Sequence, residues 1–231
     1  MSYEINLAEV DVDGAVGEAA EEVAGDTRSS FLKKAGLGAG AMIGGGSLLS
    51  ALAPAALAAS QHGRPPQSFG RGDVGILNYA LTLEYLEAAF YNGATAANLR
   101  LDAQGIVFLQ TVTKDENEHV AFLKKALGSK AAKQPKFDFK GANTNVETFM
   151  ATAEVLENTG VHAYSGQALN IRTPAYVKAA VSILTIEARH ASVIGLLNGS
   201  KGMLTPNGAF DTPYTAAKVL AAVKGTGFIT G

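Results

Sequence analysis

Residues 114–119 read Lys-Asp-Glu-Asn-Glu-His, and residues 186–190 read Ile-Glu-Ala-Arg-His. In each stretch a Glu stands three positions before a His, as Glu116 with His119 and Glu187 with His190. Two side chains at this spacing on an α-helix project from the same face. Each pair can therefore reach one ion, or two adjacent ions. The two other histidines of the chain have no Glu at this spacing.

The sequence around these pairs has the apolar periodicity of long helices. We expect four helices of roughly 25 residues each, over 73–99, 102–127, 145–170 and 173–199. Their starts carry N-cap residues or a first-turn proline, namely Asp73, Asp102, Asn145, Thr173 and Pro174. The alternation of β-branched residues that is typical of strands is absent. The sequence therefore predicts an all-α fold.

The connections between these segments predict how the helices pair. Very short turns at 100–101 and 171–172 join the first helix to the second and the third to the fourth. Short turns make consecutive helices antiparallel neighbours. A longer link, 129–144, stands between the two pairs. We expect two antiparallel hairpins joined by a crossover, followed by a turn-rich tail with one short helix over 214–224.

The first and third helices each carry a Glu among apolar residues, at Glu84 and Glu157. Each has a Tyr seven residues later, Tyr91 and Tyr164. A carboxylate buried without a partner is costly, so these positions call for a cation. Glu87 and Glu154 are the alternatives to Glu84 and Glu157, and we prefer Glu157 because its spacing to Tyr164 matches that of Glu84 to Tyr91.

The two halves of the chain form an internal repeat. Glu84 and Glu157 are 73 positions apart, and Glu116 and Glu187 are 71 apart. Each predicted hairpin would bring one Glu and one Glu-x-x-His to the middle of the bundle. This is the arrangement of dinuclear carboxylate sites in four-helix bundles.

Several stretches resemble the ferritin-like superfamily, and more closely the ferritin-like family that includes desiccation-related and stress-linked exported proteins. They are ILNYALTLEYLEAAFY, DENEHVAFL, ENTGVHAYSGQA, ILTIEARHAS and FDTPYTAAKVL, within about residues 73–229. The resemblance implies a ferritin-like four-helix bundle with a dinuclear iron or manganese site. Its six ligands would be Glu84, Glu116, His119, Glu157, Glu187 and His190, with Glu116 or Glu187 bridging the metals. Carboxylates with two imidazoles suit Fe or Mn.

Other polar residues have more ordinary roles. Tyr91 and Tyr164 are candidates for hydrogen-bond donors to the ligands or for radical relays, although buried aromatics with satisfied hydroxyls are the more common case. His162 is expected to be a packed or surface residue. Solvent-exposed helix positions are expected for Glu118, Glu147 and Arg189.

Residues 1–59 have the layout of an export leader. A basic patch, Arg28 with Lys33 and Lys34, precedes an uncharged stretch that ends in small residues near Ala59. The segment 27–33 resembles the twin-arginine export motif, with Ser29 in place of the second Arg. We expect cleavage after export to the periplasm, cell envelope or medium; the alternative is a membrane anchor formed by this segment. Residues 60–72 are interpreted as a linker and 73–231 as the ferritin-like domain.

Composition excludes several other classes of protein. The chain has no Cys, which excludes disulfides, thiolate metal sites and iron–sulfur clusters. The leader takes 3 of the 19 Lys and Arg and 8 of the 21 Asp and Glu, so the remainder has a net charge of +3. That charge is too small to indicate nucleic acid as a partner. Two functions remain: oxidation of Fe(II) or detoxification of oxygen species with O2 or peroxide, and a non-enzymatic protective or envelope role.

Overall fold

The computed structural model describes residues 63–200, 205 and 208–230. The predicted leader and His62 lie outside these residues. Within the described part there are five α-helices and an isolated β-bridge instead of a sheet. The helices are α6 (Gly72–Ala96), α7 (Ala103–Leu127), α8 (Val146–Gln167), α9 (Pro174–Leu197) and α10 (Ala216–Thr226). The predicted all-α fold is confirmed.

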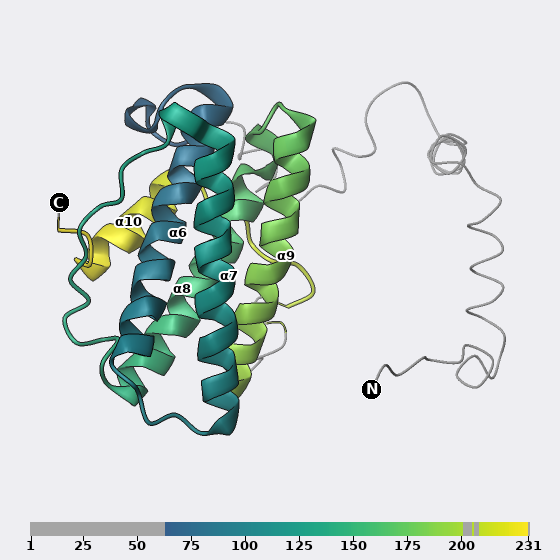
Figure 1. The fold of residues 1–231 in the computed structure, drawn as a ribbon. Coiled ribbons are helices and arrows are strands. Elements are labelled where there is room, and N and C mark those ends of the chain that lie inside the picture. Colours follow the sequence, from purple (N-terminus) through teal and green to yellow (C-terminus); the bar gives the residue numbers. More distant parts are fainter. Residues whose placement is uncertain (1–62, 201–204, 206–207, 231) are drawn as a thin grey trace, which may run out of the picture. The chain divides into compact units, whose positions relative to one another are not determined.

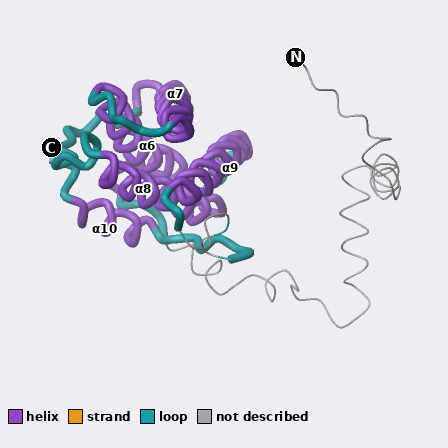
Figure 2. The backbone as a smooth tube through the Cα atoms, turned by 90° about the horizontal axis from the view of Figure 1, so that it is seen from below, coloured by secondary structure: helices purple, strands orange, loops and turns teal. Residues whose placement is uncertain are grey.

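The four long helices form a bundle of two antiparallel hairpins (Figure 1). α6 packs against α7 and α8 against α9, and the second view shows the four helices grouped with α10 beside α8 (Figure 2). The contact between α7 and α9 is much thinner than the contacts within the hairpins. The bundle core holds stacked and edge-on rings, including Phe90 packed parallel to Phe149 with centroids 5.5 Å apart. This is the predicted arrangement of hairpins and crossover.

Two of the predicted helix caps are present in the structure. The Asp102 side chain accepts a hydrogen bond of 2.7 Å from the amide of Gly105, at the start of α7. The Asn145 side chain accepts one of 3.1 Å from the amide of Thr148, at the start of α8. These bonds satisfy amides that the first helical turn leaves unpaired. Local sequence is sufficient to predict them because the partners lie three residues apart.

The prediction that Asp73 caps α6 is wrong. Arg71 occupies the N-cap position, and Asp73 lies within the first turn. Its carboxylate instead accepts hydrogen bonds from the amides of Arg172 (3.0 Å) and Thr173 (2.8 Å), at the start of α9. Thr173 is the N-cap residue of α9 but makes no side-chain cap bond there. Asp73 therefore satisfies the amide of the N-cap residue of α9 and the amide before it.

The crossover contacts α6 at its start and the tail further along. Asn78 on α6 accepts a hydrogen bond of 2.8 Å from the amide of Ala132 and donates to the carbonyl of Lys130 at 3.0 Å. Phe137 in the crossover forms an antiparallel bridge with Ile229. The short tail helix begins two residues later than predicted, at Ala216, and it packs on α8.

Residues before α6 also contact the bundle. The carbonyl of Gly63 accepts hydrogen bonds from the amide of Ala216 (2.9 Å) and from the side chain of Gln167 (2.8 Å).

Among the described helices, α9 is the one long and apolar enough to cross a membrane by length and composition alone. Because α9 also carries buried Glu187 and His190 into the bundle, we interpret it as a core helix of a folded domain.

Candidate metal centre

Four helices each bring one fully buried glutamate to the middle of the bundle. Glu84 comes from α6, Glu116 from α7, Glu157 from α8 and Glu187 from α9, and each has a relative exposure of 0%. His119 and His190, one turn after Glu116 and Glu187, lie in the same place. The structure thus brings together all six residues that the sequence singles out, from positions up to 106 apart in the chain.

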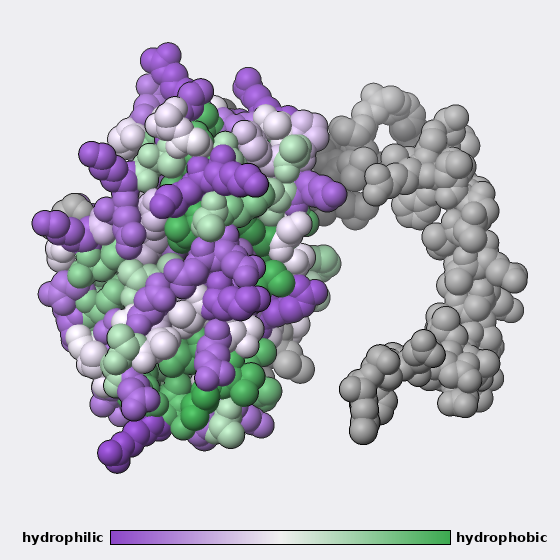
Figure 3. All heavy atoms as spheres, in the orientation of Figure 1, coloured by the Kyte–Doolittle hydropathy of each residue, from purple (hydrophilic) through white to green (hydrophobic). Residues whose placement is uncertain are grey.

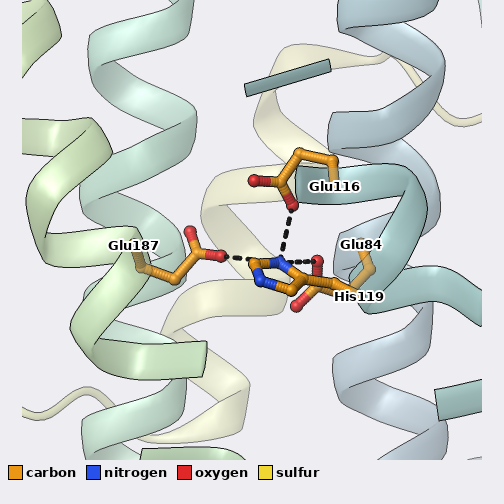
Figure 4. Close-up of side chains that lie close together, drawn as sticks. All are labelled: Glu84, Glu116, His119 and Glu187. Atoms are coloured by element: carbon orange, nitrogen blue, oxygen red, sulfur yellow. Dashed lines mark hydrogen bonds and ion pairs between the residues drawn. The ribbon is translucent and has the colours of Figure 1, made fainter. Parts of the chain in front are cut away.

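The first group surrounds His119. Its Nδ1 atom lies 3.2 Å from Oε2 of Glu84, 3.2 Å from Oε2 of Glu116 and 3.5 Å from Oε1 of Glu187 (Figure 4). The carboxylates approach the ring nitrogen from three different helices, α6, α7 and α9. One imidazole therefore meets three carboxylates at one point.

The second group surrounds His190. Its Nδ1 atom lies 3.2 Å from Oε1 of Glu116 and 3.2 Å from Oε2 of Glu157. Glu187 completes the group, and one ligand atom from each of its four residues lies within 4.8 Å of the others. Glu116 and Glu187 belong to both groups. The two carboxylates considered as bridges from the sequence are thus the two that the groups share.

Several of these atoms lack hydrogen bonds, although they are buried and close together. Within the described residues this holds for Glu116 Oε1, Glu157 Oε2, both carboxylate oxygens of Glu187, and Nδ1 of His190. Of these atoms, Nδ1 of His190 lies 3.2 Å from Glu116 Oε1 and 3.2 Å from Glu157 Oε2. Buried polar atoms without partners are rare in proteins and call for an explanation such as an ion. The donor set, carboxylate oxygen with imidazole nitrogen, fits a pair of divalent cations.

Two buried tyrosines donate hydrogen bonds to the outer carboxylates of the cluster, which are those of Glu84 and Glu157 and each belong to one group alone. The Tyr164 hydroxyl on α8 donates a hydrogen bond to Oε1 of Glu84 on α6. The Tyr91 hydroxyl on α6 donates to Oε1 of Glu157 on α8. Burial, and then the charge of the neighbouring carboxylate, raises the pKa of each tyrosine well above its usual value. Both hydroxyls therefore keep their protons and act as donors.

The cluster carries more negative charge than its imidazoles balance. Burial, and then the charge of Glu116, raises the pKa of Glu187 well above the usual range. Burial and the charge of Glu84 raise the pKa of Glu116 to about 7. Burial alone would lower the pKa of His190, but its contacts with Glu116 and Glu157 outweigh this and raise it to about 11. Glu116, Glu187 and His190 thus hold protons that offset the negative charge of the cluster. A metal cation bound among these side chains would take over that role.

Glu87 is a further buried carboxylate beside the cluster. Burial, and then the charges of Glu187 and Glu116, raises its pKa well above the usual range. It belongs to neither ligand group, whereas Glu84 belongs to the first. Gly160 on α8 makes the necessary space, because a Cβ atom there would collide with Oε2 of Glu187 and lie 3.5 Å from Oε1 of Glu87.

Glu154 and His162, both on α8, lie outside the cluster. The Glu154 carboxylate accepts hydrogen bonds from Asn198 (2.6 Å) and Ser200 (2.8 Å), so it links α8 to the end of α9. The His162 ring stacks on Tyr214 with centroids 4.1 Å apart, which is the packed role expected for it. Among the surface charges, Glu118 is exposed as expected, in an ion pair of 3.4 Å with Lys114.

Comparison with known families agrees with this geometry. A family model described as a ferritin-like domain matches residues 72–200, more than half of the chain. The chain belongs to the ferritin-like domain family. The matched region contains all of α6, α7, α8 and α9, and so all six residues of the two groups. No match was found among curated protein sequences.

Two residues of this ferritin-like domain act at the cluster but were not singled out from the sequence. Asp115 approaches His190, with Oδ2 3.2 Å from Nε2. Gly160 leaves room for Glu187. An acid directly before a Glu-x-x-His motif is a usable signal, because it lies on the flank of the helix that faces the neighbouring hairpin. A helical glycine among buried residues is the corresponding signal for Gly160.

Proposed function

We propose that this is an exported ferritin-like protein that binds two iron ions in its buried carboxylate–histidine cluster and uses them in oxidative chemistry with O2 or peroxide. The observation that carries the proposal is the sharing of Glu116 and Glu187 by two ligand groups of equal composition. Each group has three carboxylates and one imidazole. Two cations held by shared carboxylates make a dinuclear site, and manganese is the alternative metal since it favours the same ligands.

The fold supplies a rigid and dry environment for such a site. The four central glutamates are completely buried and come from four helices that pack tightly in pairs. Bound iron would supply the electrons, because each Fe(II) that becomes Fe(III) gives one electron to O2 or peroxide. The protein's part is to hold the ligands, exclude bulk water and keep the hydrogen bonds that the Tyr91 and Tyr164 hydroxyls donate to Glu157 and Glu84. Removal of Fe(II) and peroxide is a protective activity, in line with the resemblance to stress-linked proteins.

A groove between α7 and α9 leads from the surface to the cluster. It has a volume of about 650 Å³ and reaches Asp115 and His190 at its inner side. Most of its wall is apolar, including Val107, Phe108 and Val193. Hydrophobic side chains gather on the surface around this groove, over the ends of α7 and α9 that lie lowest in the view (Figure 3). Such a lining favours a small apolar molecule such as O2 over a charged metabolite.

The test of the metal site is the metal content of the purified protein after anaerobic reconstitution with Fe(II). We expect about two equivalents per chain, and less than one would refute the proposal. Glu157→Gln should bind less metal. Glu154→Gln is the matched control, because Glu154 is on the same helix but bonds to Asn198 and Ser200, and it should bind as much metal as the wild type.

The oxidative part needs its own measurement. Iron-loaded protein should consume O2 or peroxide as Fe(II) is oxidised, at a rate well above that of Fe(II) in buffer. Full metal binding without this reaction would refute the oxidative activity and support the non-enzymatic role. Export is tested by mass spectrometry of the protein recovered outside the cytoplasm. A start near Ser60 is expected, and an intact Met1 would contradict cleavage.

A further inference from the structure

The two histidines of the cluster differ in the contacts of Nε2, the ring nitrogen that points away from the central glutamates. For His190, Nδ1 faces Glu116 and Glu157, and Nε2 lies 3.2 Å from Oδ2 of Asp115 on the neighbouring helix. For His119, the contacts with carboxylates of the described residues are all made by Nδ1. Carboxylates thus contact both ring nitrogens of His190 but, among the described residues, only Nδ1 of His119.

The internal repeat explains this difference. Asp115 directly precedes Glu116, and the matching position before Glu187 is Ile186. An Ile side chain has no atom that accepts a hydrogen bond, so the second half of the repeat lacks the carboxylate that the first half presents. The asymmetry is therefore built into the sequence.

The two ligand groups are otherwise closely matched. Each contains three carboxylates and one imidazole, and each outer carboxylate receives a hydrogen bond from a buried tyrosine. Glu87 also breaks the repeat, since its counterpart 73 positions later is Gly160. However, after burial, the charges that raise the pKa of Glu87 come first from Glu187 and Glu116, which both groups share, so Glu87 does not set one group apart from the other. The contact of Asp115 with His190, in contrast, belongs to one group alone.

We propose that the metal position formed by Glu116, Glu157, Glu187 and His190 is filled first and more tightly, and that Asp115 is the positioning residue responsible. A carboxylate on the outer nitrogen of a ligating imidazole fixes the tautomer, orients the ring and makes the inner nitrogen a better ligand. With a cation bound, Nε2–H would donate to Asp115 and leave the Nδ1 lone pair directed at the cluster. The position of Glu84 and His119 fills second and releases its ion more readily. This inference rests on the proposed dinuclear site.

The experiment is a titration of the metal-free protein with Co(II), followed by visible absorption in competition with a chelator. The wild type should bind about two ions in two separate steps. Asp115→Asn should weaken the tighter step by about 10- to 100-fold and leave the weaker one in place. Glu118→Gln is the control, because it removes the same charge from an exposed position of the same helix. It should leave both steps unchanged.

Two histidine variants assign the steps to their positions and do not depend on the folding of Asp115→Asn. His190→Ala should remove the tighter step and His119→Ala the weaker one. Ile186→Asp should strengthen the weaker step and bring the two affinities closer. Two equal steps in the wild type, or loss of the tighter step in His119→Ala, would overturn the inference and leave the dinuclear site standing. Absence of Co(II) binding in the wild type would instead count against the proposed function.

Discussion

The hydroxyl of Tyr164 on α8 donates a hydrogen bond to the buried carboxylate of Glu84 on α6, and Tyr91 makes the reciprocal bond from α6 to Glu157 on α8. Each tyrosine thus serves the glutamate of the other half of the repeat. In each half of the repeat, the Tyr follows the Glu by seven residues, which places it two turns further along the same face of the helix. This equal spacing lets each hydroxyl reach the glutamate of the other hairpin. The two hairpins are joined through their site as well as through their apolar core.

The first prediction concerns these tyrosines. Tyr164→Phe should lower the free energy of unfolding of the metal-free protein by about 1–3 kcal/mol, because it leaves a buried carboxylate oxygen without its donor. Tyr91→Phe should have a similar effect. Urea denaturation measures both. Tyr85→Phe is the control, since that hydroxyl makes one long bond of 3.4 Å to a carbonyl, and its effect should be smaller. Equal losses for Tyr85 and Tyr164 would contradict the role given to Glu84.

The second prediction concerns the space that Gly160 leaves on α8. Gly160→Ala should keep the fold, because the new Cβ would meet the flexible end of Glu187 and not backbone. The carboxylate must move away, so we expect affinity for Co(II) to fall by roughly tenfold or more. Gly225→Ala is the control, because nothing lies within 4 Å of a Cβ added there. It should leave metal binding intact and raise stability by about 0.5–1 kcal/mol. Unchanged affinity in Gly160→Ala would count against Glu187 as a ligand.

The third prediction is a pH dependence that comes from Asp73. Burial acts to raise its pKa, but hydrogen bonds from Thr173 and Arg172 outweigh it, so the pKa lies below the usual 3.8. A group whose pKa is lowered by folding stabilises the folded state above its unfolded pKa, and this contribution is lost as the pH falls through the folded value. At pH 7, Asp73→Ala should cost about 1 kcal/mol of unfolding free energy.

Denaturation over a pH series measures this effect. The difference between the wild type and Asp73→Ala should be constant near neutral pH and shrink once the pH falls below 3.8. A difference that grows on acidification would show that the sign is wrong. Asp102→Ala, which removes a local cap, is the comparison for a bond of the same type within one helix.

The fourth prediction concerns removal of the metal. A chelator should lower the thermal midpoint, because the folded cluster binds cations and the unfolded chain does not offer the same site. Free metal at 100 times the dissociation constant should stabilise the protein by about 2.7 kcal/mol per site. Differential scanning calorimetry at increasing Co(II) measures the shift. In Glu157→Gln the shift should be smaller, and an equal shift in both proteins would point to binding elsewhere.

The elements that depend on short-range sequence are those that could be predicted. The helix starts at Asp102 and Asn145 follow from caps that reach three residues, and the Glu-x-x-His pairs follow from helix geometry. Asp73 fails as a cap because its partners are 99 and 100 residues away, on the start of another helix. Nothing in the local sequence reports such a contact. For Asp115, the place directly before a Glu-x-x-His motif marks the residue as a candidate, but its partner His190 is 75 residues away and is not indicated by the local sequence.

The candidate site shows the same division. Spacing and the internal repeat point to the six residues that the structure places together, and the seven-residue step to the tyrosines favours Glu157 over Glu154. The preference for Glu84 rests on its spacing to Tyr91, and Glu87 stays open as an alternative because both lie on the buried side of α6 and differ in which side chains of the other helices they meet. Which carboxylate faces which neighbouring helix is decided by how the helices pack, and the pattern of a single helix does not report that.

The bridge between Phe137 and Ile229 has a consequence for the order in which the molecule is made. The amide of Thr230 donates to the carbonyl of Lys136 at 2.9 Å, so the crossover can find this partner only after residues 229 and 230 have been synthesised. By that time all four helices of the bundle have been synthesised. Contacts between such distant residues form slowly, because a long loop must close first. The bridge that holds the crossover can therefore form only after all four helices of the bundle have been made.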